Sequence, residues 1–235
     1  MIEILHRDAA LAVVAKPAGR IVVPGRAGAA AERCLRDELA DQLGQPVFVV
    51  HRLDRGTSGA LAFALTAEAH RALSLAFERH QVDKRYWALC RGALLGAGEV
   101  DLALVPIRGG KMRAARAGET DGKPSRTGWR ALERWGAFTA VEFRPRTGRL
   151  HQIRVHAAAL GHPLAVDPDY GGAAALTRRD LDPGARAGDD EVVVGRLTLH
   201  AASLRFRHPS DGVPVEVTAP LPADLAAALA LLRPA

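Results

Sequence analysis

The sequence predicts an α+β fold, in which a mixed, mostly antiparallel sheet carries helices packed against it. Stretches of alternating or β-branched residues outnumber stretches with helical periodicity, by ten to four. Several strand-like stretches also follow one another without an intervening helix, whereas a doubly wound sheet requires regular alternation of strand and helix. Strands therefore dominate the expected fold.

The expected strands are defined by period-two alternation and by β-branched content. In chain order they lie at residues 2–5, 12–15, 47–50, 60–66, 85–91, 99–105, 125–132, 138–144, 196–206 and 213–219. Because no repeat or break in composition separates any of them, we expect one continuous catalytic domain over residues 1–235.

Helices are expected where apolar residues recur every three or four positions, at residues 29–43, 67–80, 151–160 and 222–232. Thr66 is well placed to cap the second helix, with Glu68 in its first turn, and Gly161 to end the third. Two segments rich in turn-forming residues, 108–124 and 178–195, are expected to be mobile loops.

Composition excludes several classes of protein. With 235 residues, of which 48% are hydrophobic and 25% charged, the chain is long and apolar enough to bury a core, which excludes disorder for most of it. No apolar run reaches the roughly 18 to 20 residues of a membrane span, and the first residues lack the plan of a signal peptide. We therefore expect a soluble cytoplasmic protein, with Cys34 and Cys90 as reduced thiols.

Positive charge is concentrated in one part of the chain. The whole chain carries a formal net charge of +6, while twelve basic and four acidic residues lie between Arg108 and Arg154. This local excess fits a polyanionic partner such as nucleic acid. Arginine-rich solvated faces explain the same composition equally well, so charge alone does not decide the function.

The segment His51–Gly59 is unusual because many polar residues follow a short apolar strand. A plain connection between two strands needs only one or two turn-forming residues, such as Gly59. On local grounds alone, Asp54 is best interpreted as a residue that supports a turn, with Thr57 and Ser58 as a capping pair.

The string His-Arg-Leu-Asp-x-x-Thr-Ser-Gly, however, closely resembles the signature of the RluA-type pseudouridine synthases. The resemblance continues in order along nearly the whole chain, in a form that lacks the small N-terminal RNA-binding domain of many relatives. The other matching segments are Lys16–Gly19, Lys84–Ala88 with Gly92, Arg146–His156, Gly161–Pro163, Asp167–Gly171, Leu199–Ala201 and His208–Pro209. Val166 and Ser125 depart from the usual family residues.

This resemblance implies an enzyme that isomerises a uridine in ribosomal or transfer RNA to pseudouridine. By position, Asp54 is the catalytic carboxylate, Arg154 the cation that pairs with it, and Tyr86 the tyrosine that stacks on the target base. Arg52 fits the residue that contacts the position vacated when the base leaves the RNA stack. His51 is interpreted as a structural hydrogen-bonding residue. Further RNA contacts are expected from basic residues, namely Lys111, Arg113, Arg116, Arg146 and Arg149.

The same resemblance implies no metal, nucleotide or redox cofactor, and we expect a monomer. His151, His156 and His162 form a local cluster, but spacings of five and six do not place all three on one helical face. A zinc site is therefore a weak hypothesis.

Two other functions compete with this one. A non-catalytic RNA-binding or ribosome-assembly protein would keep the scaffold but would have no need for Asp54, Tyr86 and Arg154 together. A hydrolase with Ser58 as nucleophile is disfavoured because the sequence lacks a Gly-x-Ser-x-Gly elbow at that position.

Overall fold

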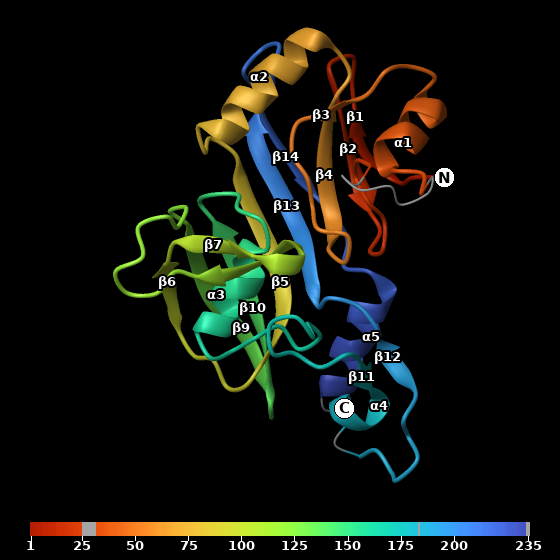
Figure 1. Cartoon of the computed structure of the whole chain (residues 1–235). Coiled ribbons are helices and arrows are strands. Elements are labelled where there is room, and N and C mark those ends of the chain that lie inside the picture. The colour runs from red at the N-terminus through yellow and green to blue at the C-terminus, as the bar shows by residue number, and fades with distance from the viewer. Residues whose placement is uncertain (25–31, 183, 234–235) are drawn as a thin grey trace. The chain divides into compact units, whose positions relative to one another are not determined.

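Most of the expected strands are present in the computed structural model, which describes residues 1–24, 32–182 and 184–233 (Figure 1). Contacts divide the chain into two compact units. The first comprises Met1–Lys84 and Ala201–Pro220, and the second Arg85–His200 and Leu221–Ala235. Strands β5 (Asp83–Arg91) and β13 (Leu199–Arg207) each run from one unit into the other. The single domain expected from the sequence stays a prediction.

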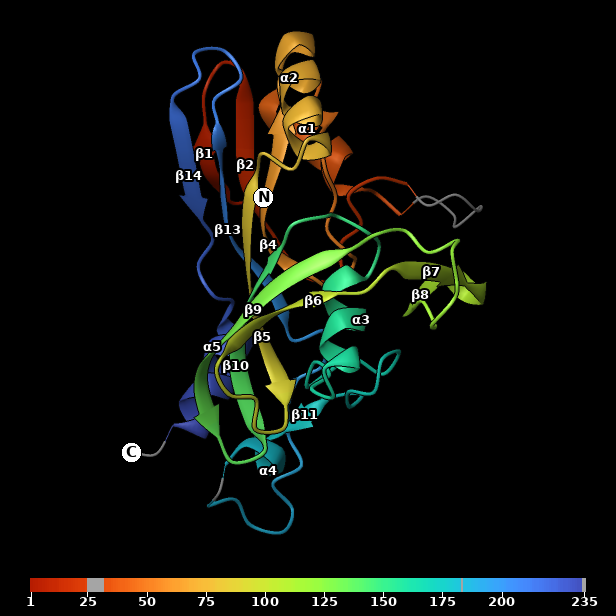
Figure 2. The same cartoon turned by 90° about the vertical axis from the view of Figure 1, so that its left-hand side faces the viewer.

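The first unit is a sheet with helices on one side. The strands follow the order β1 (Ile4–Arg7), β2 (Leu11–Lys16), β4 (Ser58–Ala64) and β13, with β3 (Phe48–Val49) paired to β4 and β14 (Pro214–Thr218) paired to β13. Helices α1 (Leu35–Leu43) and α2 (Ala67–Glu78) lie on the same side of these strands (Figure 2). Ala69 and Leu73 of α2 pack in one core with buried residues of β2 and β4, and Leu35 and Leu39 of α1 are also buried.

Gly59 permits a close approach between β4 and β13. A Cβ atom at this position would lie 2.2 Å from the Ala201 main-chain oxygen, and its φ of +118° is one that other residues rarely adopt. The glycine of the signature segment is therefore required by packing within this unit.

The second unit contains a second set of antiparallel strands, in the order β5, β10 (Phe138–Pro145), β9 (Arg126–Trp135) and β6 (Ala97–Asp101). Helix α3 (Gln152–Ala159) contacts β9 and β10 and also the hairpin of β7 (Leu104–Ile107) and β8 (Lys111–Ala114). Leu104, Met112 and Val155 form the small buried cluster that fixes the hairpin to the helix. The remaining elements are the short 3-10 helix η1 (Arg108–Gly110), β11 (Leu176–Thr177), α4 (Arg178–Leu181), β12 (Val192–Val194) and α5 (Ala223–Leu232).

The fold class predicted from the sequence is confirmed, whereas several local predictions are wrong. The segment 108–124 contains η1 and strand β8, and the segment 178–195 contains α4 and β12, so neither is simply a loop. The strand expected at 99–105 is divided between β6 and β7. The first helix begins at Leu35, and positions 29–31 of its expected range lie outside the described residues.

The expected helix boundaries at Thr66 and Gly161 are confirmed. The Thr66 hydroxyl accepts a hydrogen bond from the Ala69 main-chain N–H, and Gly161, with φ of +79°, follows the last turn of α3. Even α2, at 12 residues the longest helix in the described part of the chain, falls short of the length that a membrane span needs.

Candidate active site

Asp54 lies in the first unit, in the turn that leads into β4. The Thr57 main-chain N–H donates to the Asp54 main-chain oxygen at 3.1 Å, so main-chain atoms close the turn. Asp54 is half-buried, and its carboxylate makes no hydrogen bond to another described residue of its unit. The interpretation of Asp54 as a side chain that merely supports the turn is therefore wrong, because the turn does not use its carboxylate.

Lys16 holds this turn in place from the end of β2. Its side chain is almost completely buried, and its Nζ donates to the main-chain oxygens of Pro17 at 3.0 Å, Arg55 at 3.1 Å and Thr57 at 2.8 Å. Gly19 N–H also donates to the Arg55 oxygen, at 2.8 Å. A buried ammonium group needs such partners, since leaving it unpaired is costly. Lys16 thus restrains the main chain on the carboxyl-terminal side of Asp54.

The Thr57 hydroxyl is an exception in this well-bonded turn. Thr57 is 2% exposed, and its Oγ1 is the one buried side-chain polar atom among the described residues that has no hydrogen-bond partner. Such atoms are rare in folded proteins because an unpaired buried hydroxyl lowers stability. Ser58 is buried at the start of β4 in the same segment, which further disfavours its use as a hydrolase nucleophile.

His51 has a structural role, as expected. Its Nε2 accepts a hydrogen bond from the Ala62 main-chain N–H at 3.0 Å, and its ring stacks on Phe77 with the ring centroids 4.2 Å apart. Burial, with a smaller contribution from the positive charge of Lys84, lowers the pKa of His51 to about 3, so the imidazole is neutral. Arg52, the next residue, is exposed, as a group that contacts RNA must be.

Tyr86 and Arg154 belong to the second unit and are associated with the same apolar cluster. Tyr86 lies on β5 opposite Phe143 of β10 and packs against a cluster that includes Ile153. Ile153 directly precedes Arg154 on α3. Tyr86 is half-buried.

The Arg154 guanidinium is held by two carboxylates that the sequence analysis did not assign to it. Nε and Nη2 donate to the two oxygens of Asp167, both at 2.7 Å, and Nη2 also donates to Asp169 at 2.9 Å. Arg154 is 5% exposed and Asp167 is fully buried. The positive charge of Arg154 and the negative charge of Asp167 therefore stabilise each other at a place where water does not solvate them. The pairing of Arg154 with Asp54 stays a prediction.

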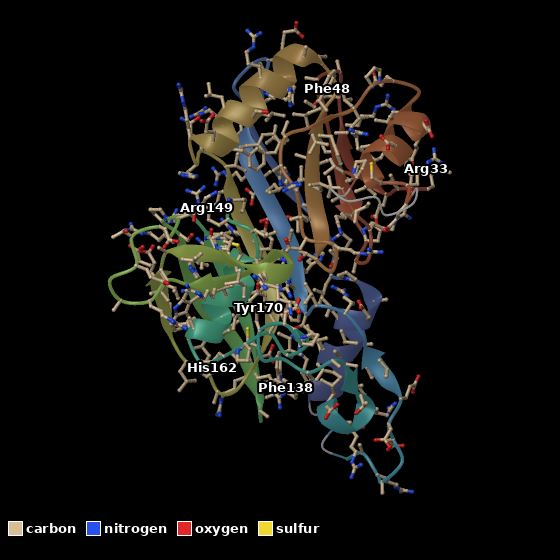
Figure 3. All side chains as sticks on the ribbon, viewed as in Figure 1. Arg33, Phe48, Phe138, Arg149, His162 and Tyr170 are labelled. Carbon is tan, nitrogen blue, oxygen red and sulfur yellow. The ribbon has the colours of Figure 1, made fainter. Side chains whose placement is uncertain are left out.

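Tyr170 connects Arg154 with the β7–β8 hairpin. The Arg154 guanidinium carbon lies 4.7 Å from the centroid of the Tyr170 ring, a distance typical of a cation–π contact. The Tyr170 hydroxyl accepts from the Met112 main-chain N–H at 2.9 Å and lies 2.7 Å from His151 Nδ1. His151 adopts the left-handed conformation, with φ of +53°, which non-glycine residues rarely do and which is often found at functional sites. Figure 3 labels Tyr170 among the side chains of this region.

The histidine cluster does not resemble a metal site. His156 Nδ1 lies 2.8 Å from Thr127 Oγ1 and its Nε2 lies 3.1 Å from the Leu102 main-chain oxygen. His162 Nδ1 bonds to the Arg91 oxygen at 2.9 Å. No group of metal-ligating side chains occurs in the part of the chain that the structure describes.

The expected RNA-contacting cations fall into two groups. Lys111 and Arg113 are ion-paired, to Asp169 and Glu119 respectively, each at 2.6 Å. The pairing with Arg113 is the main reason that the pKa of Glu119 is lowered to about 2. Three others are exposed and have no ion-pair partner among the described residues, namely Arg116, Arg146 and Arg149.

Comparisons with known proteins agree with the motif pattern. The sequence profile of the RNA pseudouridylate synthase family matches residues 10–159. The chain is 38% identical to ribosomal large subunit pseudouridine synthase D of Xylella fastidiosa, over 99% of this chain and 70% of that protein. It is 35% identical to tRNA pseudouridine synthase C of Salmonella typhi, over 94% of this chain and 86% of that protein.

A solved structure is also similar. Human RNA pseudouridylate synthase domain containing 1 superimposes with a TM-score of 0.75 at 28% sequence identity, over 97% of this chain and 87% of that one. The structural likeness therefore extends over nearly all of the chain.

Proposed function

The chain belongs to the RNA pseudouridylate synthase family, and we propose that it converts a specific uridine of ribosomal or transfer RNA to pseudouridine with Asp54 as nucleophile. The observation that supports this proposal most strongly is the hydrogen bonding of the turn that contains Asp54. The turn is fixed by main-chain bonds and by Lys16, while the carboxylate itself is left without a structural hydrogen bond in its unit. A side chain held in place but not used by the fold is what a nucleophile requires.

The reaction is an isomerisation, so no oxidant, reductant or co-substrate is needed. The bond between uracil N1 and ribose C1′ breaks, the uracil turns, and a bond forms between C5 and C1′. The C5 proton is lost to a base, and N1 gains a proton. Asp54 acts as the nucleophile, toward the sugar or toward the base, and leaves again when the new bond has formed.

The other two residues support this chemistry. By the family resemblance, Arg154 is the cation that favours the ionised form of the nucleophilic carboxylate, in addition to the hydrogen bonds that it donates to Asp167 and Asp169. Tyr86 stacks on the uracil and assists removal of the C5 proton. Because a stacked uridine is out of reach of a carboxylate, the base must leave the helix, which costs a few kcal/mol. Arg52 occupies the vacated position.

A non-catalytic RNA-binding protein is the competing proposal. It predicts the same affinity for RNA but no change in any uridine. The strongest argument against it is that the Asp54 carboxylate makes no hydrogen bond to another described residue of its unit, so the turn does not explain its presence. Binding to a polyanion would gain nothing from a free carboxylate at that position.

Pseudouridine mapping tests the proposal. Total RNA from cells that lack the gene should lose pseudouridine at one or a few positions in ribosomal or transfer RNA, and the wild-type gene should restore them. A gene that encodes the Asp54→Asn variant is the matched control and should restore pseudouridine at none of these positions. If no position changes, or if the control restores the lost positions, the proposal is wrong.

A further inference from the structure

The basic segment between Arg108 and Arg154 contains three exposed cations that lie on adjoining stretches of chain in the second unit. These are Lys123, Arg146 and Arg149, which we name the cationic rim. In the described part of the chain, none of the three has a carboxylate partner.

The two stretches that carry the cationic rim are bonded to each other. The Arg146 N–H donates to the Arg126 main-chain oxygen at 2.9 Å, and the Arg126 N–H donates to Thr147 Oγ1 at 3.1 Å. Arg149 Nε donates to the oxygen of Pro124, the residue after Lys123, at 3.3 Å. The three cations therefore lie on one bonded surface and not on independent loops.

The side chain of Gln152 restrains this surface through hydrogen bonds. It is 4% exposed and uses both ends of its amide. Its Oε1 accepts from Thr147 Oγ1 at 2.7 Å and from the Arg149 N–H at 3.0 Å. Its Nε2 donates to the Arg126 oxygen at 3.0 Å and to Thr127 Oγ1 at 2.9 Å. A buried amide satisfied on all sides restrains the surrounding main chain.

Neighbouring cations of the same unit already contact carboxylates. Arg126 pairs with Asp101 at 2.7 Å, and Arg130 and Arg144 both pair with Glu142, at 3.3 Å and 2.8 Å. A phosphate that approached these side chains would compete with a carboxylate already in place. At the cationic rim it would meet no such competitor.

The cationic rim belongs to the same unit as Arg154. Arg149, whose side chain is labelled in Figure 3, lies three residues before the first residue of α3, the helix that carries Arg154. Its Nε is used by Pro124, which leaves both Nη groups without a partner among the described residues. Planar Arg donors suit the oxygens of a phosphate.

We propose that Lys123, Arg146 and Arg149 bind the RNA phosphate backbone next to the target uridine, and that the ion-paired cations around them do not. This inference rests on the proposed function for its ligand. It revises the expectation that Lys111 and Arg113 contact phosphates, because both are engaged by carboxylates.

Salt-dependent RNA binding tests the cationic rim. The rim variant carries Lys123→Gln, Arg146→Gln and Arg149→Gln, and the control variant carries Arg126→Gln, Arg130→Gln and Arg144→Gln, so both lose three positive charges. Each phosphate contact adds roughly 0.7 to 0.9 to the slope of log affinity against log salt. We expect the rim variant to reduce the slope by roughly 2 to 3 and the control variant by less than about 1.

The reduction should be equal for a transfer RNA and a ribosomal RNA fragment, because phosphate contacts do not read sequence. An unchanged slope in the rim variant, an equal reduction in both variants, or an effect on only one RNA would overturn the inference. Arg146→Gln alone repeats the test with a side chain that makes no hydrogen bond in the described structure, and should reduce the slope by roughly 0.7 to 0.9.

Filter binding requires no turnover, so the two proposals fail separately. If the wild-type protein modifies RNA while the rim variant keeps the wild-type slope of log affinity against log salt, only the proposal about the cationic rim is wrong. If the wild-type protein modifies no uridine while the rim variant shows the expected reduction in the slope of log affinity against log salt, only the proposed function is wrong.

Discussion

Replacing Arg154 by methionine should destabilise the fold far more than the same change at Arg196. Both arginines make two 2.7 Å bonds to a single carboxylate, Arg154 to Asp167 and Arg196 to Asp224. They differ in burial. The side chains of the first pair are 6% and 0% exposed, and those of the second are 16% and 33% exposed. Solvent therefore screens only the second pair effectively.

The expected magnitudes follow from this contrast. Arg154→Met leaves the buried charge of Asp167 unpaired, which typically costs about 3 to 5 kcal/mol. Arg196→Met leaves a carboxylate that water reaches, and about 1 kcal/mol is expected. Replacing Arg154 and Asp167 together by apolar residues should cost less than Arg154→Met alone, because no buried charge remains.

Urea unfolding followed by circular dichroism measures these differences. The reasoning is refuted if Arg154→Met costs less than about 1 kcal/mol, since that is the range of exposed pairs. It is also refuted if Arg154→Met and Arg196→Met cost the same, because Arg154 is the more buried of the two and also contacts Asp169 and Tyr170.

Three further predictions concern the first unit. Lys16→Met removes the three hydrogen bonds of a buried ammonium group and should destabilise the fold by several kcal/mol, with a loss of kcat greater than any change in KM; a stable and fully active variant would contradict this. Thr57→Val removes an unpaired buried hydroxyl and should raise the unfolding free energy by about 1 kcal/mol in urea titrations, whereas a clear loss would reveal a bond at Oγ1. Burial alone would raise the pKa of Asp8, but hydrogen bonds from Ala10 and His6 outweigh it and lower that pKa. Asp8 therefore adds stability that is complete above about pH 4 and is lost as the pH falls, so the gap between wild type and Asp8→Ala in melting experiments should narrow in acid; a gap independent of pH would contradict this.

The fold class was predictable because it depends on local patterns. β2 and β4 are short apolar runs buried on both faces, and the second half of β10 alternates between buried and partly exposed residues; both kinds of pattern can be recognised within a short window of sequence. The β7–β8 hairpin was missed for the opposite reason. Its strands are four residues each, and Leu104 and Met112 are ordered by contact with Val155 on α3, about 40 to 50 residues further along the chain.

The candidate site shows the same limit. The signature segment identified Asp54 as a candidate because its residue types occur in consecutive positions. The support of Lys16 for Thr57 spans 41 positions, and the pairing of Arg154 with Asp167 spans 13. Contacts between residues so far apart in the sequence produce no periodic pattern from which they could be predicted. A lysine at the end of a buried apolar strand was the one local hint, since such a charge needs buried partners.

Tritium release from an RNA labelled at uridine C5 tests the central assignment most directly. We predict that the wild-type protein releases tritium from its target RNA, and that Asp54→Asn binds the same RNA with similar affinity but releases none, because the amide keeps the shape of the carboxylate without its nucleophilic charge. Near-normal tritium release by Asp54→Asn would contradict the account, because Asp54 could then not be the nucleophile.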